Sequence, residues 1–189
     1  MKRTIKNIFK AAGIIFNSEL LSKISKIETD FQFLLTEKIK SDKKYDSPKS
    51  LMKYGWKAYS QNDEDGIICE ILNRIGVTNK IFVEFGVGDG LENNTLILLF
   101  QGWTGLWIEG NANSYKKIVR GYEEYIKKET LRVEKQFITQ KNINEIIKNN
   151  IKETEIDILS IDIDGNDIYI FESINAISAD LQSSQNNCR

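Results

Sequence analysis

The chain has 189 residues, of which 41% are hydrophobic and 28% are charged, and its formal net charge is -1. This length and apolar content fit one domain with an appendage better than two domains. A near-neutral chain gives no electrostatic reason to expect a nucleic acid as partner. Histidine is absent, which excludes serine–histidine and cysteine–histidine catalytic pairs and leaves acid–base chemistry to carboxylates, lysines or tyrosines.

Cysteine usage and hydropathy indicate the compartment. Cys69 and Cys188 form neither a disulfide framework nor a metal-binding spacing, which favours a reducing environment. No run is long and apolar enough to span a bilayer, and the N-terminal apolar patch is too short for a signal peptide. We therefore expect a cytoplasmic protein.

Residues 1–57 are predicted to be a helical extension and a linker. Five apolar residues recur at helical spacing among lysines and an arginine: Ile5, Ile8, Phe9, Ala12 and Phe16. Residues 2–16 are therefore a candidate basic amphipathic helix on an anionic membrane surface. The favoured interpretation is a helix that packs on its own domain or on a second subunit. A second helix is predicted at 22–40, and the polar stretch 41–50 indicates a linker.

Residues 58–175 alternate helices with strands. Ser60 or Asn62 is predicted to cap the first helix, which Gly76 ends. Strands follow at 81–85, 105–109, 131–138 and 156–163, with helices from 93 or 94, at 114–127, at 143–151 and at 168–174. This alternation predicts an α/β fold, a parallel sheet with helices on both faces. The loop after the first strand then lies at the carboxyl edge, where such folds bind ligands.

A glycine-rich loop, Gly-Val-Gly-Asp-Gly at 86–90, joins the first strand to the next helix. Leu91 stands where a dinucleotide fingerprint has its third glycine, and the phosphate loop ending in Gly-Lys-Ser/Thr is absent. Glu84, Asp89 and Glu92 flank the loop, and like charges about 4 Å apart repel by about 4 kcal/mol at an effective dielectric of about 20. The acids therefore disfavour a pyrophosphate and favour a ligand with ammonium and sulfonium groups, such as S-adenosylmethionine. The alternative is a tight connection without a ligand.

Glu109 ends the second predicted strand, about twenty residues after the glycine loop. An acid at this point can accept both hydroxyls of a ribose. It indicates adenosine but does not distinguish a dinucleotide from S-adenosylmethionine. Gly110 and Asn111 continue the turn and complete the predicted cofactor site with Asp89.

An acidic turn, Asp-Ile-Asp-Gly-Asn-Asp at 162–167, follows the fourth predicted strand. Asp162 and Asp164 are two residues apart, so both can point to one side and accept a proton from a hydroxyl as a methyl group is transferred. Two alternatives remain open: Mg²⁺ held by the same pair, and a polar turn that satisfies backbone groups. Asp167 is a candidate substrate-binding residue.

Four segments together resemble the FkbM-type branch of class I S-adenosylmethionine-dependent methyltransferases: YSQNDEDGI, VEFGVGDGLENNT, GWTGLWIEGN and ILSIDIDGND. The resemblance runs from about residue 59 to 174. It implies a Rossmann-like sheet and cofactor contacts from Glu84, Gly86, Gly88, Gly90 and Glu109. It implies that the segment 60–66 closes over the cofactor, with Tyr59 and Gln61 beside the substrate. Members typically methylate hydroxyl groups of sugars, glycans or related natural products.

The C-terminus departs from this family. A complete class I sheet has seven strands in the order 3-2-1-4-5-7-6, whereas four are predicted here, and residues 176–189 read as a polar tail. We therefore expect a C-terminally truncated sheet, with the fourth strand at an open edge unless a partner or the N-terminal helices cover it. Three functions follow: a methyltransferase for a small-molecule or glycan hydroxyl, a non-catalytic remnant that binds the cofactor or a partner, and a NAD-type oxidoreductase.

Overall fold

The computed structural model describes residues 20–184 except 21, 28, 32, 164 and 166. The predicted membrane-surface segment 2–16, Asp164 and Cys188 lie outside the described residues. The chain divides into two compact units, residues 1–53 and 54–189. In the described part of the first unit, a helix covers most of 20–41, close to the predicted 22–40. Short 3₁₀ helices follow at η1 (Lys43–Tyr45) and η2 (Met52–Tyr54). Within the described residues, no helix has the length and apolar content needed to cross a membrane.

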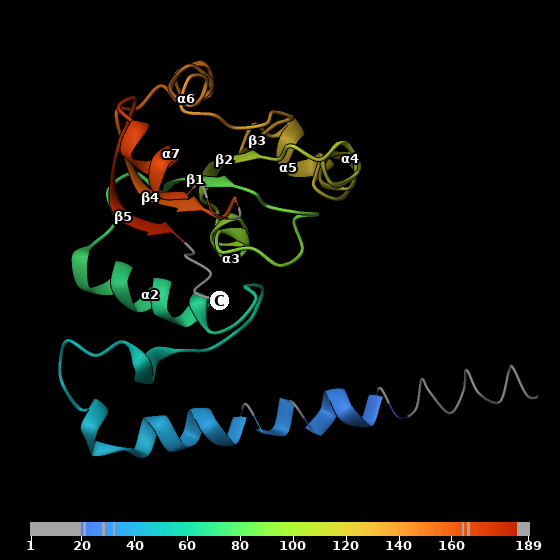
Figure 1. The fold of residues 1–189 in the computed structure, drawn as a ribbon. Coiled ribbons are helices and arrows are strands. Elements are labelled where there is room, and N and C mark those ends of the chain that lie inside the picture. The colour runs from blue at the N-terminus through green and yellow to red at the C-terminus, as the bar shows by residue number, and fades with distance from the viewer. Residues whose placement is uncertain are drawn as a thin grey trace, which may run out of the picture. The chain divides into compact units, whose positions relative to one another are not determined.

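The second unit is built on a five-stranded sheet in which all neighbouring strands are parallel (Figure 1). Its strands are β1 (Ile81–Phe85), β2 (Thr104–Ile108), β3 (Leu131–Glu134), β4 (Glu155–Ile161) and β5 (Ser178–Ser184). They lie in the order β3-β2-β1-β4-β5, which is the order of Rossmann-like sheets. The α/β fold predicted from the alternating segments is therefore confirmed.

Helices cover both faces of the sheet, so each face has its own apolar core. The helices are α2 (Glu64–Ile75), α3 (Leu96–Phe100), α4 (Ala112–Gly121), α5 (Glu123–Lys127), α6 (Ile143–Asn150) and α7 (Asp167–Ser173). Residues of α2, α3 and α4 pack with Phe82 and Trp107 in one cluster, and residues of α6 and α7 pack with Val83 and Phe85 in the other. Figure 1 shows α2 and α3 on the side of the sheet opposite α6 and α7.

The expectation of four strands and a polar tail was wrong at residues 178–184. These residues form β5, which pairs in parallel with β4 from Glu155↔Ser178 to Ile161↔Ser184. The ladder is made by backbone groups, so an edge strand tolerates polar side chains that hide it in a hydropathy pattern. The partly buried Ile177 and Ala179, which pack against the second core, were the available signal. The fourth strand is therefore not at the edge of the sheet.

Two further element predictions need correction. The predicted helix 114–127 is two helices, α4 and α5, divided at Tyr122, whose buried hydroxyl donates to the carbonyl oxygen of Gly90. The predicted strand 131–138 ends at Glu134, and the chain then leaves the sheet. Trp103 and Trp107 are both buried in the first core cluster.

Asp157 in β4 fixes the start of β1 through four backbone groups. Its buried carboxylate accepts N–H bonds from Thr78, Asn79 (3.0 Å), Lys80 (2.6 Å) and Ile81 (3.2 Å). Burial alone would raise the pKa of Asp157, but the four N–H groups outweigh it and hold the pKa below its ordinary value of 3.8. The carboxylate therefore stabilises the fold above its ordinary pKa, and this contribution is lost as the pH falls through the lowered value.

We expect Asp157→Asn to lower the free energy of unfolding by about 3 kcal/mol, because an amide cannot accept at both positions and turns an N–H group toward backbone donors. Urea unfolding at pH 7 measures this. Asp180→Asn is the matched control, because Asp180 is exposed and, among the described residues, accepts one hydrogen bond, from the Thr78 hydroxyl (3.0 Å). The control should change stability by less than about 0.5 kcal/mol. Equal losses in both variants would contradict the anchoring role.

Candidate functional site

The three glycines after β1 are required for different reasons. All have positive φ, at 76° for Gly86, 58° for Gly88 and 81° for Gly90. A Cβ at Gly86 would lie 1.7 Å from the carbonyl oxygen of Asp162, and one at Gly90 would lie 3.0 Å from the ring of Tyr122. At Gly88, no described atom lies within 4 Å of the Cβ position. Gly86 and Gly90 therefore permit close packing within the protein, while Gly88 presents bare backbone to open space.

Glu109 follows β2 and holds this loop in place. One oxygen of its buried carboxylate accepts the N–H of Gly88 at 2.8 Å, and the other accepts the N–H of Asn111 at 2.6 Å. Asn111 in turn caps α4, because its side chain accepts the N–H groups of Asn113 and Ser114. Each carboxylate oxygen has about two acceptor positions, so each keeps one for a ligand hydroxyl.

A large cavity, cavity A, opens beside Glu109 with a volume of about 780 Å³. It is lined by residues at or after the ends of β1, β2, β3 and β4 and by residues of α7: Gly86, Gly88, Ile108, Glu109, Gly110, Asn111, 136–140, Asp162, Ile163, Tyr169 and Ile170. Phe137 is 78% exposed and packs over Gly110, where a Cβ would lie 2.6 Å from its ring. Cavity A therefore combines an aromatic wall with a carboxylate. Sequence reasoning missed the 136–140 wall because it assigned the first part of that segment to a strand.

A smaller cavity, cavity B, of about 170 Å³ also borders the glycine loop. Its lining residues are Gln61, Glu84, Gly86, Val87, Gly88, Asp89, Glu92, Asn93, Asn94 and Asp162. Gly86, Gly88 and Asp162 line both cavities. The structure therefore brings the acids that the sequence predicted around the loop to one small polar space, together with Asp162 from β4.

Glu84 is the most deeply buried of these acids, and the protein already engages both of its oxygens. They accept the N–H groups of Asn94 (2.9 Å) and Thr95 (3.2 Å), the Thr95 hydroxyl (2.5 Å) and the Ser160 hydroxyl (3.3 Å). Burial raises the pKa of Glu84 to about 7, although these hydrogen bonds lower it in part. Glu84 thus joins β1 to the start of α3 and to β4, and its contact with a cofactor stays a prediction.

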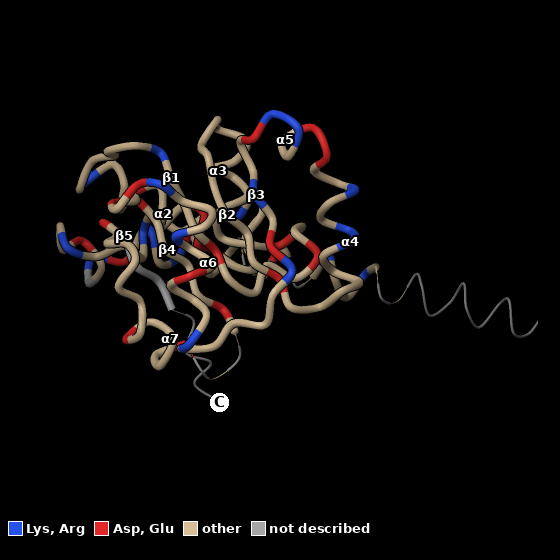
Figure 2. The backbone as a smooth tube through the Cα atoms, turned by 90° about the horizontal axis from the view of Figure 1, so that it is seen from above, with Lys and Arg blue, Asp and Glu red and all other residues tan. Residues whose placement is uncertain are grey.

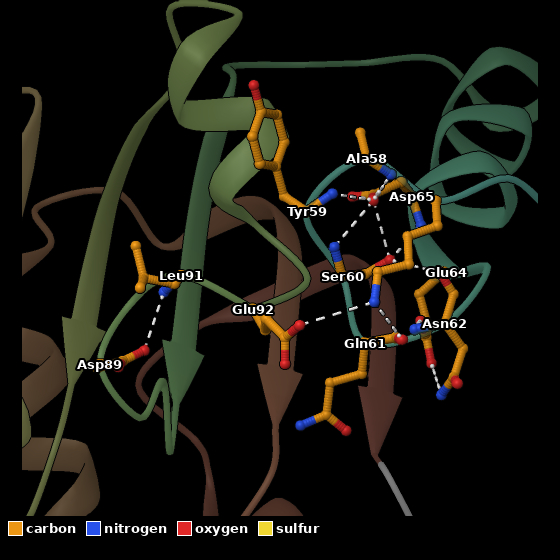
Figure 3. A network of polar contacts seen from close by, with 11 residues as sticks. Ala58, Tyr59, Ser60, Gln61, Asn62, Glu64, Asp65, Asp89, Leu91 and Glu92 are labelled. Atoms are coloured by element: carbon orange, nitrogen blue, oxygen red, sulfur yellow. Dashed lines mark hydrogen bonds and ion pairs between the residues drawn. The ribbon is translucent and has the colours of Figure 1, made fainter. Parts of the chain in front are cut away.

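The segment before α2 is fastened by one buried carboxylate (Figure 3). Asp65 Oδ2 accepts the backbone N–H groups of Ala58 (2.6 Å), Tyr59 (2.7 Å) and Ser60 (2.9 Å), and also the Ser60 hydroxyl (2.9 Å). Ser60 Oγ accepts the N–H of Asp65 at 3.2 Å, so Ser60 does serve the helix terminus, although the N-cap position is Asp63. A Cβ at Gly66 would lie 2.1 Å from the carbonyl oxygen of Tyr54, so glycine is needed where this segment crosses α2.

The same segment forms one wall of cavity B. Lys57 Nζ lies 3.7 Å from a carboxylate oxygen of Glu92 and donates to the carbonyl oxygen of Gln61 at 2.7 Å. The side chain of Gln61 extends away from Asp65 in Figure 3 and lines cavity B. Tyr59, in contrast, packs edge-on against Phe100 at 5.1 Å between ring centroids and lines neither cavity A nor cavity B. The structure thus brings Gln61 to the site but not Tyr59.

The acidic turn after β4 is only partly described, because Asp164 and Asn166 lie outside the described residues. Asp162 lies between the two cavities, with its N–H donated to the carbonyl oxygen of Phe85 at 3.1 Å. Asp167 is buried, accepts the N–H of Ile163 at 2.9 Å and lines neither cavity, so it closes the turn. In the described part of the chain, no cluster of three or more acids or cysteines could hold a metal ion. The Mg²⁺ alternative depends on Asp164 and stays open.

Known proteins resemble this chain only distantly. No family model matches the chain, and no curated protein matches it by sequence. Among solved structures, the METTL16 MTase domain is 17% identical over 57% of this chain and 43% of that chain, with a TM-score of 0.44. Human methyltransferase 10 domain containing protein is 17% identical over 51% of this chain and 44% of that chain (TM-score 0.40). An RNA methyltransferase from Salinibacter ruber in complex with S-adenosyl-L-homocysteine is 15% identical over 58% of this chain and 68% of that chain (TM-score 0.39).

The chain spans less than half the length of the first two of these structures. At this distance the likeness describes only the fold, and the site has to be judged by its own geometry.

The raised pKa of Glu84 makes stability depend on pH. Between the ordinary value of 4.5 and about 7, the folded chain binds more protons at Glu84 than the unfolded chain does. The free energy of unfolding should therefore fall as the pH rises through this interval, by about 3 kcal/mol if Glu84 acts alone. Glu84→Gln should be less stable at every pH, because its amide faces backbone donors, but should lack this slope. Urea unfolding at pH 4.5, 6 and 7.5 measures both, and equal slopes in the two proteins would contradict the assignment.

Proposed function

We propose that this chain binds S-adenosylmethionine and transfers its methyl group to a hydroxyl of a sugar, glycan or related small molecule. One observation carries the proposal: the glycine loop separates a large cavity with an aromatic wall and a fixed carboxylate from a small cavity lined by acids. An S-adenosyl ligand matches this pair of cavities. Its flat base and ribose diol suit the large cavity, and its cationic groups at the other end suit the small one.

Cavity A fits adenosine. Its volume of about 780 Å³ is within the usual range of roughly 300–1,000 Å³ for small-molecule sites. Ile108, Phe137 and Ile163 supply apolar walls for a base, and Glu109 supplies two acceptors for the ribose hydroxyls. Because its carboxylate is held by Gly88 and Asn111, little reorganisation is needed when the ribose binds.

The charges around cavity B separate this cofactor from a dinucleotide. A pyrophosphate at the glycine loop would lie against cavity B, which Glu84, Asp89, Glu92 and Asp162 line. Lys117 pairs with Asp89 at 3.2 Å and Lys57 with Glu92 at 3.7 Å, which offsets two of these acids at the surface. The acidic lining of cavity B as a whole disfavours a phosphate and favours a sulfonium or ammonium group. The NAD-type alternative is therefore disfavoured.

Methyl transfer needs alignment and a proton acceptor. In the proposed reaction the acceptor oxygen forms a bond to the methyl carbon as the carbon–sulfur bond breaks, and the sulfonium becomes a neutral thioether. The hydroxyl proton moves to a carboxylate, for which Asp162 is the first candidate because it lies where the two cavities meet. Asp164 stays a second candidate from the sequence.

The charge distribution supports an acceptor that is not a polyanion. Figure 2 shows basic residues along α4 and charges of both signs around α5, where Lys127 pairs with Glu123 at 2.7 Å and Lys128 with Glu124 at 2.6 Å. Together with a net charge of -1, this mixed surface offers little attraction to a nucleic-acid backbone. A small neutral hydroxyl compound or glycan in the cytoplasm is the proposed acceptor.

Glu109→Gln tests the cofactor site. Calorimetry with S-adenosylhomocysteine should show micromolar binding to the unmodified chain and binding at least about tenfold weaker in the variant, because glutamine offers one acceptor instead of two. Glu123→Gln is the matched control on the surface of α5 and should bind as the unmodified chain does. No heat with S-adenosylhomocysteine or S-adenosylmethionine in the unmodified chain would exclude the proposed function.

Asp162→Asn tests the reaction. With methyl-labelled S-adenosylmethionine and a panel of glycans, turnover should fall by about 10²-fold or more, as expected for the loss of a general base. The affinity for S-adenosylhomocysteine should change much less than turnover does. Cofactor binding without label transfer to any glycan of the panel would favour the alternative of a non-catalytic binding protein.

A further inference from the structure

Asn93 has a buried side chain that the protein does not satisfy. It is 6% exposed, and neither its amide nitrogen nor its amide oxygen has a hydrogen-bond partner among the described residues. The neighbouring Asn94 is equally buried at 5%, yet its amide donates to the Ser160 hydroxyl at 3.1 Å. The two residues lie side by side in the sequence, and only Asn94 is explained by contacts within the protein.

A buried amide without a partner is costly, and buried polar atoms in folded proteins nearly always have one. A leucine of similar volume would avoid this cost. Asn93 also lines cavity B, so a molecule in that cavity can supply the missing partners. The side chain has the properties of a ligand-binding group whose partner arrives with the ligand.

The shape of cavity B limits what that ligand can be. It adjoins cavity A along Gly86, Gly88 and Asp162, so one molecule can occupy both if a thin chain crosses the glycine loop. Its volume of about 170 Å³ corresponds to about five or six water-sized groups, at about 30 Å³ each. An α-amino-acid end, with one nitrogen, two carbons and two oxygens, has this size.

The side-chain amide of Asn93 also suits an α-amino-acid end. An amide donates from nitrogen and accepts at oxygen, so it can bind a carboxylate and an ammonium at the same time. The acids that line cavity B attract an ammonium and repel a carboxylate. The Asn93 amide is thus suited to bind the carboxylate within an otherwise acidic space.

We propose that Asn93 recognises the α-amino-acid end of an S-adenosyl ligand in cavity B and thereby distinguishes this ligand from nucleosides that lack that end. The inference rests on the proposed function, because it requires adenosine in cavity A. It assigns to Asn93 a role in specificity and none in the transfer of the methyl group.

The test compares two ligands that share the adenosine and differ at the end in question. S-adenosylhomocysteine carries the amino-acid end, and 5′-methylthioadenosine replaces it with a methyl group. Calorimetry should show that Asn93→Leu weakens the binding of S-adenosylhomocysteine by about tenfold or more. The affinity for 5′-methylthioadenosine should stay the same within about twofold. Asn93→Ala is the second variant, in case leucine does not fit the cavity.

Thermal unfolding without ligand distinguishes a ligand-binding role of Asn93 from a role in holding the fold together. Asn93→Leu should unfold at or above the temperature of the unmodified chain, because it removes an unsatisfied amide, whereas Asn94→Leu should unfold at a lower temperature. Equal weakening of both ligands by the Asn93 variants would overturn this inference alone. Failure of both ligands to bind the unmodified chain would overturn the proposed function and this inference with it.

Discussion

The backbone of the loop after β1 touches the backbone of the loop after β4, and the carboxyl edge of the sheet depends on this contact. Only glycine permits it, because any side chain at residue 86 would overlap the carbonyl group of Asp162. The contact makes the glycine loop a thin partition with a cavity on each side, and Gly86 and Asp162 belong to both walls. In the proposed function, this partition lies between the adenosine of the ligand and its amino-acid end.

Buried carboxylates hold the segments around this partition, and each does so by accepting backbone N–H groups. Asp157 fixes the start of β1, Asp65 fastens the segment before α2, and Glu84 ties β1 to α3. Glu109 does the same for Gly88 and Asn111. Glu109 lines cavity A and Glu84 lines cavity B, whereas Asp65 and Asp157 line neither cavity. Glu109 differs from Glu84 because each of its oxygens accepts one hydrogen bond instead of two.

The sequence was informative where chemistry follows apolar periodicity. Continuous apolar runs predicted β1, β2 and β4. Glu109, predicted to bind a ribose, accepts the N–H of Gly88 in the glycine loop, and its contact with a ligand stays a prediction. The sequence was misleading at β5, whose polar side chains conceal backbone pairing, and at residues 136–140, which leave the sheet to line cavity A. The roles of Asp157 and Asn93 were not predicted, because the sequence does not show whether a polar residue is buried. Only its neighbours in the folded structure reveal its role.

The fastening by Asp65 has a consequence for amide hydrogen exchange. Ala58 and Tyr59 have exposed side chains on a segment without regular secondary structure, where amides usually exchange with solvent within seconds. Here their N–H groups, with that of Ser60, end on one buried carboxylate oxygen. Exchange at all three amides therefore requires the same local opening of the structure. These surface amides should take up deuterium slowly and together, at a rate typical of amides in the core.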